Sequence, residues 1–104
     1  FNSVYLFPHA EALRLITGLP FYTGSFVHLG ERGYNIERLY NFREGLTGKD
    51  DSLPDRLTKT PQDPNNPKTV VRLDKMLPVY YSIRGWDANG APTKRKLRKL
   101  RIQA

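Results

Sequence analysis

The sequence predicts an all-α fold: one compact domain, residues 1–104, with about four principal helices and a long proline-rich loop. Three observations support this prediction. Apolar residues recur at gaps of three and four, the periodicity of helices that face a core. Glycines follow several of these segments, at the position where a left-handed residue commonly ends a helix. Segments with the alternating pattern of a strand are minimal.

The first predicted helix is His9–Leu19, which begins after Pro8 and is closed by Gly18. Its apolar side is expected to carry Ala12, Leu13, Ile16 and Leu19. The apolar stretch before it, residues 1–7, is expected to be the end of a helix that continues from residues outside this sequence, with a buried strand as the alternative. The stretch lacks the features of a signal peptide, so we expect a part of a longer protein.

A long central helix is predicted to begin at Phe26 and to end at Gly45. Its core-facing stripe is expected to consist of Leu29, Gly33, Ile36 and Tyr40, with Leu39 and Phe42 on a neighbouring face. Gly30 and Gly33 each cost a helix about 1 kcal/mol relative to alanine. This cost predicts that another backbone approaches the helix closely at the two glycines.

Shorter elements follow the central helix. Pro54 is expected to start a short helix. The candidates for its cap are Asp50, Asp51 and Ser52. The next residues, Thr58–Thr69, contain three prolines and are expected to form an exposed loop, because proline suits neither a helix interior nor a central strand.

Two further helices complete the predicted fold. Asp74 is expected to cap a helix at Lys75–Arg84, after which Trp86 packs back onto the domain. Thr93 is expected to cap a final helix at Lys94–Leu100. The core contacts of this last helix are expected to be Leu97 and Leu100.

The composition excludes several classes of site. The chain contains no cysteine, which removes disulfides, thiolate catalysis and a self-contained zinc or iron–sulfur site. His9 and His28 lie far apart in the sequence, and neither has a carboxylate or a second histidine at the usual metal-ligand spacing, so we expect ordinary side chains. Residues 87–90 lack the sixth-position glycine and closing glutamate of a calcium loop and predict a turn. No run of about eighteen apolar residues is present, so we expect no membrane partner.

Charged residues around the end of the central helix are expected to form a structural clamp rather than a catalytic site. Adjacent carboxylates such as Asp50 and Asp51 point in different directions, which argues against a paired acid and base. The clamp would tie the central helix to the turn that follows it. Its expected members are Arg38, Arg43, Glu44, Asp50, Asp51 and Arg56.

The C-terminal run Lys94–Arg101 holds six basic residues in eight. One interpretation is a small basic helical module that binds nucleic acid or another anionic partner. The preferred interpretation is a solvated terminal helix whose cations complement the negative end of the helix dipole, because no aromatic residue is available for stacking on bases. Nucleic acid is therefore not the expected partner.

Several strings in the sequence resemble the C-terminal helical part of the tungsten-containing aldehyde:ferredoxin oxidoreductases. The strings are Ile16–Gly18, Leu29–Arg32, Asn35–Gly45, Asp50–Arg56, Leu73–Leu77, Tyr80–Tyr81, Arg84–Asp87 and Asn89–Gly90. They cover roughly residues 10–100 in the order and with the spacing of the family. The chain is thus similar to one C-terminal domain of a larger enzyme.

The resemblance implies a parent enzyme of the cytoplasm that oxidises aldehydes to carboxylic acids and reduces ferredoxin. In the family the cofactors are a tungsten bis-pterin and a 4Fe-4S cluster, held by residues upstream of the part matched here. This domain would cover the cofactor, shape the substrate channel and be inactive alone, with the remainder of the enzyme as its partner and a homo-oligomer as an alternative role. No catalytic residue can be carried over, and this chain is expected to bind no cofactor. The last cluster cysteine would fall just before Phe1, which places Phe1, Asn2 and Ser3 near the cluster.

Overall fold

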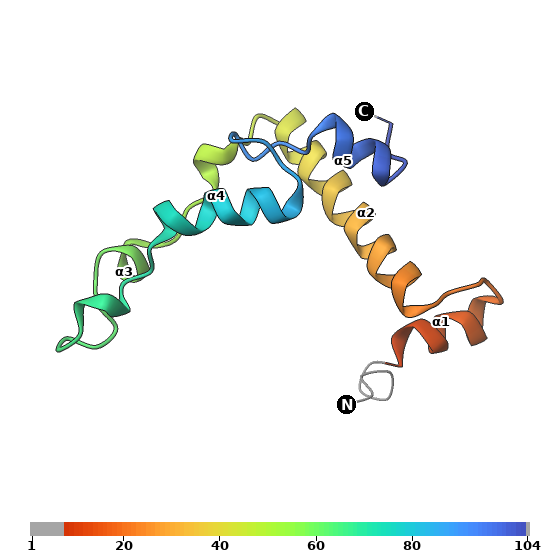
Figure 1. Ribbon diagram of the computed structural model, residues 1–104, viewed down its shortest axis with the longest axis horizontal. Helices are drawn as coiled ribbons and strands as arrows, with labels where there is room; N and C mark the ends of the chain where they lie inside the picture. Colours follow the sequence, from red (N-terminus) through yellow and green to blue (C-terminus); the bar gives the residue numbers. More distant parts are fainter. Residues whose placement is uncertain (1–7, 104) are drawn as a thin grey trace.

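The computed structural model describes residues 8–103, which are helical and without strands, and the all-α class is confirmed. Figure 1 shows the order of the elements along the chain. They are α1 (His9–Thr17), α2 (Thr23–Arg43), η2 (Gly48–Asp50), α3 (Asp55–Thr58), η3 (Pro67–Thr69), α4 (Leu73–Arg84) and α5 (Lys94–Lys99). The long helices α1, α2 and α4 together with α5 are the four principal helices, and α3 is a single turn.

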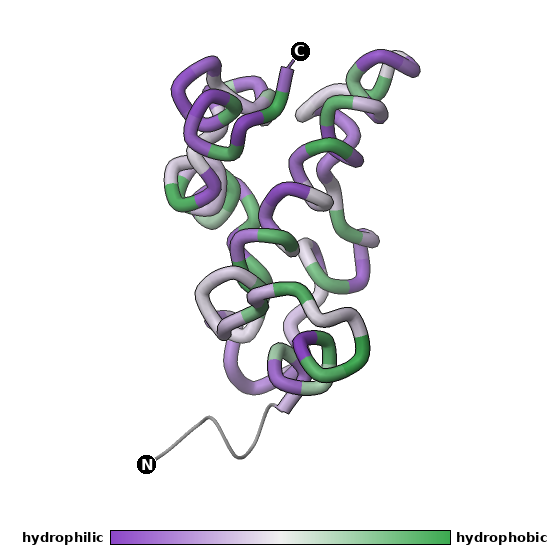
Figure 2. Tube along the Cα trace, turned by 90° about the vertical axis from the view of Figure 1, so that its right-hand side faces the viewer, coloured by the Kyte–Doolittle hydropathy of each residue, from purple (hydrophilic) through white to green (hydrophobic). Residues whose placement is uncertain are grey.

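The helices form an arch rather than a closed bundle (Figure 1). One arm is α2, against whose first turns α1 packs, and the other arm is α4, with α3 and the proline-rich loop at its far end. The molecule measures 54 × 37 × 20 Å, and its radius of gyration is 18.1 Å. A globular domain of this length has a radius of gyration of about 13 Å. The chain is therefore elongated, and Figure 2 shows apolar segments spread along its length.

Several helix boundaries differ from the prediction. The helix α2 begins at Thr23, three residues before Phe26, and no side chain caps it. Asp74 does not cap α4, because that helix begins at Leu73 and Asp74 lies in its first turn, where a carboxylate favours the helix dipole. The prediction that glycines end the helices is confirmed for α1 and α4. Gly18 and Gly85 follow these helices with left-handed φ angles of 70° and 73°.

The candidate caps of the short helix are also corrected. No side chain caps α3, whose N-cap position is occupied by Pro54. Asp50 instead accepts a hydrogen bond from the backbone of Thr47 and closes a capping box around η2. Thr93 does cap α5 as predicted, because its hydroxyl accepts a hydrogen bond from the Lys96 amide.

The predicted apolar stripe of α2 does not face the core of the described chain. Leu29, Ile36 and Tyr40 are 49%, 49% and 60% exposed, whereas Asn35 is fully buried. With about 100° of rotation per residue, the stripe lies roughly 100–140° around the helix from Asn35. The inward face instead follows the series Glu31, Asn35, Arg38 and Phe42. The stripe prediction was wrong because it counted only apolar residues.

The predicted close approach at the glycines of α2 is likewise absent from residues 8–103. A Cβ atom added to Gly30 or Gly33 would meet nothing within 4 Å. The apolar side of α1 is also open, with Ile16 83% and Leu19 54% exposed. By contrast, the buried positions of Trp86, Leu97 and Leu100 agree with the prediction. The described core therefore lies at one end of α2, around Trp86.

Candidate functional site

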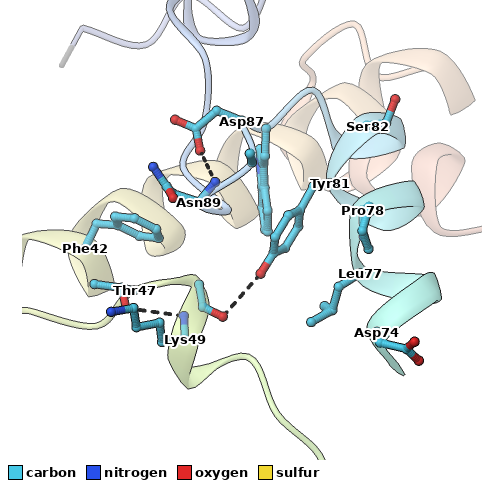
Figure 3. Close-up of a pocket in the computed structure, with 13 residues that line it drawn as sticks. Phe42, Thr47, Lys49, Asp74, Leu77, Pro78, Tyr81, Ser82, Asp87 and Asn89 are labelled. Carbon is cyan, nitrogen blue, oxygen red and sulfur yellow. Dashed lines mark hydrogen bonds between the residues drawn. The ribbon is translucent and has the colours of Figure 1, made fainter. Parts of the chain in front are cut away.

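The main concentration of side-chain interactions lies where α2 meets η2, α4 and the turn that follows α4. We call this region the Trp86 junction, and its core members are Asn35, Arg38, Asp51, Tyr81, Trp86 and Gly90. Figure 3 shows Tyr81 of α4 directed toward the η2 segment. The residues come from segments far apart in the sequence, so the junction joins both arms of the arch.

The backbone around Gly85 places Trp86 in the junction. The Gly85 amide donates to the Ser82 carbonyl at 3.1 Å, and the Trp86 amide donates to the Tyr81 carbonyl at 2.8 Å. These two bonds form a Schellman motif, which reverses the chain after a left-handed residue. The following turn is held by the Asp87 carboxylate, which accepts from the amides at positions 89 and 91. The tryptophan ring is thereby turned back against α2.

Trp86 is the hub of the junction and is only 6% exposed. Its indole Nε1 donates to Asn35 Oδ1 at 2.8 Å, and Asn35 Nδ2 donates to the Glu31 carbonyl at 2.8 Å. The indole ring stacks on Tyr34 with centroids 5.8 Å apart and meets Tyr80 edge-on at 5.7 Å. The indole N–H and the Asn35 side-chain amide are therefore both hydrogen-bonded, and aromatic side chains enclose the indole ring.

Arg38 connects Trp86 to the η2 turn and to the turn at Gly90. Its guanidinium carbon lies 4.5 Å from the centre of the Trp86 ring, a cation–π contact. Its Nε donates to the Gly90 carbonyl at 2.9 Å, and its Nη1 donates to Asp51 Oδ1 at 2.7 Å. The hydroxyl of Tyr81 donates to the other oxygen of Asp51. One side chain thus holds the η2 turn and the Gly90 turn against α2.

The ion pair keeps Asp51 charged. Hydrogen bonding to Arg38 lowers the pKa of Asp51 from its ordinary value of 3.8, and this effect outweighs the opposing effect of partial burial. A carboxyl group with a lowered folded-state pKa stabilises the fold above its unfolded pKa. This contribution is lost as the pH falls through the lowered folded-state pKa.

We expect Asp51→Asn to reduce the acid sensitivity of the protein. At pH 7 the variant should be less stable than the wild type, and the difference should shrink as the pH falls from about 4 to about 2. Urea unfolding at a series of pH values measures this convergence. Asp55→Asn is the matched control, because Asp55 pairs with Lys59 on the exposed surface. Stability curves that stay parallel for Asp51→Asn and the wild type would contradict the assignment.

A second ionic cluster joins α5 to both arms. The carboxylate of Glu31 lies 2.6 Å from Arg84 Nη1 and 2.8 Å from Lys96 Nζ. The hydrogen bond from Lys96 is the largest influence on Glu31 and holds its pKa below the ordinary value of 4.5. One cation of the basic C-terminal run is therefore committed to an internal contact.

A cavity of about 990 Å³ opens beside the junction (Figure 3). Apolar groups that line it include Phe42, Leu77, Pro78 and Trp86. Its lining carboxylates have partners: Asp87 accepts the two backbone amides described above, and Asp74 pairs with Arg72 at 3.5 Å. The cavity can receive an apolar group, and it presents no adjacent pair of acid and base.

The backbone is closely packed at Gly48, on the wall of this cavity. Its amide donates to the Asn89 carbonyl at 3.1 Å, and an added Cβ atom would lie 2.3 Å from that oxygen. We expect Gly48→Ala to lower the free energy of unfolding by about 2–3 kcal/mol through overpacking. Gly30→Ala is the control, because its Cβ atom meets nothing in the described chain and alanine favours a helix by about 1 kcal/mol. Urea unfolding distinguishes them, and equal effects would contradict the close approach at Gly48.

The structure brings together only some of the predicted clamp residues. Arg38 and Asp51 form the partly buried pair described above, and Asp50 lies in the same turn but bonds to Thr47. Three predicted members lie on the surface, and no ion pair within residues 8–103 includes them. They are Arg43, Glu44 and Arg56. The residues predicted to approach the cluster, Phe1, Asn2 and Ser3, lie outside the described residues.

Sequence reasoning missed several important members of the junction. Asn35 and Glu31 were not selected because the search for a core face used only apolar residues. A signal was present in the sequence, since Glu31, Asn35 and Arg38 recur at gaps of four and three. Tyr81 was not selected as a site residue, because its bond to Asp51 depends on tertiary structure.

Two other kinds of feature are absent from residues 8–103. No cluster of three or more His, Cys, Asp or Glu side chains there is arranged to hold a metal ion. No helix in that range is long and apolar enough to cross a membrane.

Comparison with known proteins agrees with the resemblance. Residues 4–102 match the family described as aldehyde ferredoxin oxidoreductase, domains 2 and 3. The chain is 41% identical over 97 residues to the tungsten-containing aldehyde ferredoxin oxidoreductase of Pyrococcus furiosus. The proteins of the same name from Pyrococcus abyssi and Thermococcus kodakarensis are 40% and 39% identical over 98 and 97 residues.

The matched segments cover 90–91% of this chain and 16% of each of these relatives. The chain thus spans about a sixth of the length of the proteins it resembles. The family match extends over nearly all of its residues, including every helix described above. The chain belongs to the aldehyde ferredoxin oxidoreductase family and matches a part of the region described as domains 2 and 3.

Proposed function

We propose that this chain is the C-terminal helical domain of a cytoplasmic tungstopterin enzyme that oxidises aldehydes to carboxylic acids with ferredoxin as electron acceptor. The observation that carries the proposal is the family match over residues 4–102, together with about 40% identity to enzymes named for tungsten, aldehyde and ferredoxin. In this role the domain covers the cofactor and shapes the substrate passage, and it is inactive alone.

The donor set of this chain does not fit an iron–sulfur cluster. An iron–sulfur cluster needs cysteine thiolates, and none of the 104 residues is cysteine. The carboxylates of Asp51 and Asp87 are engaged, the first in the ion pair with Arg38 and the second in the turn after α4. No redox step is therefore assigned to residues of this chain. The tungsten site and the cluster belong to other parts of the parent enzyme.

A covering role is supported by the open apolar faces. Large apolar side chains on α1, α2 and α4 remain exposed, although α2 and α4 also bury Trp86. Contiguous exposed apolar surface commonly marks a contact with another protein surface. The remainder of the enzyme is the proposed partner for these faces. A homo-oligomer is the alternative occupant, and the mass of the protein in solution separates the two.

A role in the substrate passage is supported by the cavity beside the junction. Its volume of about 990 Å³ and its aromatic walls at Phe42 and Trp86 suit the apolar part of an aldehyde. The polar residues that line the cavity include Lys49 and Asn89, and they lie on the side formed by η2 and by the turn after α4 (Figure 3). An aldehyde would be guided by apolar contact, without bonds formed to this chain.

The test of the proposed function is aldehyde-dependent reduction of ferredoxin by the intact protein that contains these residues. We expect one carboxylic acid formed for each two electrons transferred, with the acid identified by mass spectrometry. The chain of residues 1–104 alone should show no turnover. Failure of the intact, metal-loaded protein to oxidise any of a set of aliphatic and aromatic aldehydes would refute the proposal.

The rival function is binding of nucleic acid through the basic C-terminal run. It is favoured by the exposed side chains of Lys94, Arg95, Arg98 and Lys99 on α5. It is weakened at Lys96, which is committed to Glu31, and at Leu97, which is buried. Titration with duplex and single-stranded DNA at several salt concentrations separates the functions. Tight, steeply salt-dependent binding that is lost on neutralising the four exposed cations would support the rival.

A further inference from the structure

A second groove lies on the side of α2 that the described chain leaves open. It has a volume of about 650 Å³ and lies between α2 and the residues that follow α5. Its lining residues are Arg32, Ile36, Leu39, Tyr40, Arg43, Arg101, Ile102 and Gln103. Three of these residues are arginines and none is acidic. The groove therefore combines a positive rim with an apolar and aromatic floor.

The groove is continuous with the apolar stripe of α2. Ile36 and Tyr40 belong to both, and Leu29 extends the stripe by two helical turns toward the N-terminal end of the helix. Arg32 and Arg43 project on the edge of the stripe nearest the C-terminal residues, while Glu37 lies at the other edge. An occupant of this surface needs apolar side chains along its length and negative charge along one edge.

The backbone at Arg101 gives an independent reason to assign a role to this groove. Arg101 is the only non-glycine residue within 8–103 that has a positive φ angle, at 54°. It occupies the left-handed position of a Schellman motif, with the Ile102 amide bonded to the Leu97 carbonyl at 3.0 Å. Glycine is the residue that fits this position with least strain. The arginine is thus placed at a position where its backbone is disfavoured and its side chain lines the groove.

We propose that the stripe and the groove form one docking surface for an amphipathic, acidic segment of the parent enzyme outside residues 1–104. This inference rests on the proposed function, since it names the chemistry by which the rest of the enzyme contacts α2. A carboxylate of the segment lies among Arg32, Arg43 and Arg101, where guanidinium groups bind carboxylates in a bidentate manner. Apolar side chains of the segment cover Leu29, Ile36 and Tyr40.

A free anion is a poorer occupant of this surface than a polypeptide. Phosphate or a small carboxylate would use the arginines and leave the stripe exposed to water. An amphipathic segment uses both, because its acidic edge and its apolar face lie side by side. The length of the curated relatives also leaves room for such a segment, since this chain corresponds to 16% of each.

The decisive experiment places a photoreactive benzoylphenylalanine at Tyr40 of the intact protein. Tyr40 is 60% exposed and lines the groove, so the probe keeps an aromatic side chain in place. After irradiation, the cross-linked peptides are identified by mass spectrometry. We expect a product with the mass of a single polypeptide, joined to a peptide outside residues 1–104 that carries at least two Asp or Glu residues. A cross-link to a second copy, to a peptide without acidic residues, or no cross-link would overturn the proposal.

Charge variants of the intact protein test the arginines. Arg43→Gln and Arg101→Gly are each expected to lower the apparent Tm by about 1–3 °C at low salt, measured at one scan rate. Arg101→Gly is informative because it relieves the left-handed backbone, so a loss is expected to come from the removed arginine side chain. Lys68→Gln is the matched control on an exposed turn and should leave Tm unchanged. Equal effects of Arg43→Gln and Lys68→Gln, or a rise in Tm for Arg101→Gly, would contradict the role of the arginines.

The outcomes separate this inference from the proposed function. An active enzyme without the acidic cross-link retains the proposed function and loses the docking surface. An inactive protein with the acidic cross-link retains the docking surface and loses the proposed function.

Discussion

Replacing Trp86 with alanine is expected to lower the free energy of unfolding by about 3–5 kcal/mol, the largest effect of any single change in the chain. The substitution removes a side chain that is only 6% exposed and that contacts the rings of Tyr34, Tyr80 and Tyr81. It also leaves Asn35 Oδ1 without its donor in a fully buried position. Urea unfolding followed by circular dichroism measures the loss.

Trp86→Phe separates the two causes of this loss. Phenylalanine keeps most of the aromatic contact but has no indole Nε1 to donate to Asn35, so we expect a smaller loss of about 1–3 kcal/mol. Trp86→Phe together with Asn35→Leu should recover part of that loss, because the unpaired amide is then removed. A Trp86→Ala variant within about 1 kcal/mol of the wild type would show that the tryptophan is not the hub of the fold.

Replacing Arg38 with methionine is expected to lower the free energy of unfolding by about 2–4 kcal/mol. Methionine keeps the apolar contact with the Trp86 ring but leaves Asp51 without its charged partner. The two side chains of the pair are only 14% and 24% exposed, so water replaces the lost interaction incompletely. The substitution also removes the donor to the Gly90 carbonyl, which frees that turn. Urea unfolding at pH 7 measures the change.

A double-mutant cycle isolates the ion pair from the other contacts of Arg38. Asp51→Asn combined with Arg38→Met should cost less than the sum of the single changes, by about 1–3 kcal/mol. Arg56→Met is the matched control, because Arg56 is exposed and should change stability by no more than about 0.5 kcal/mol. Strict additivity of Arg38→Met and Asp51→Asn would contradict a direct coupling between the residues.

The ends and starts of helices were predictable where the backbone conformation or an unpaired amide at that position favours one residue type. Gly18 and Gly85 marked helix ends because a left-handed φ angle favours glycine, and Thr93 marked a helix start because its hydroxyl can accept a backbone amide. The start of α2 was misplaced because no side chain caps it. Asp74 was misread because a carboxylate suits the first turn as well as the cap.

The faces of the helices were harder to predict than their positions. Periodicity showed that the apolar residues of the predicted stripe share one side of α2, but it wrongly placed that side against the core of this chain. The face that packs within the described chain is polar and carries Asn35, which is buried only because Trp86 and the Glu31 carbonyl satisfy its amide. Such pairings depend on three-dimensional proximity, because Asn35 and Trp86 are separated by 51 residues along the chain.

The candidate site was predictable only in part for the same reason. Arg38 and Asp51 were both selected for their charge and position, and the structure pairs them. Arg43 was selected on the same grounds, yet it projects from α2 into the open groove. The direction of a side chain around a helix can be calculated from the sequence, but the surface that it meets cannot.

We propose that this chain is a helical domain of a tungsten enzyme whose metals are held elsewhere in the polypeptide. Elemental analysis by mass spectrometry of two purified samples, the intact protein and residues 1–104 alone, tests it most directly. We expect close to one tungsten and four iron atoms per intact polypeptide, and neither metal in residues 1–104. Stoichiometric tungsten or iron in residues 1–104, or an intact protein without tungsten, would refute this assignment of the metals.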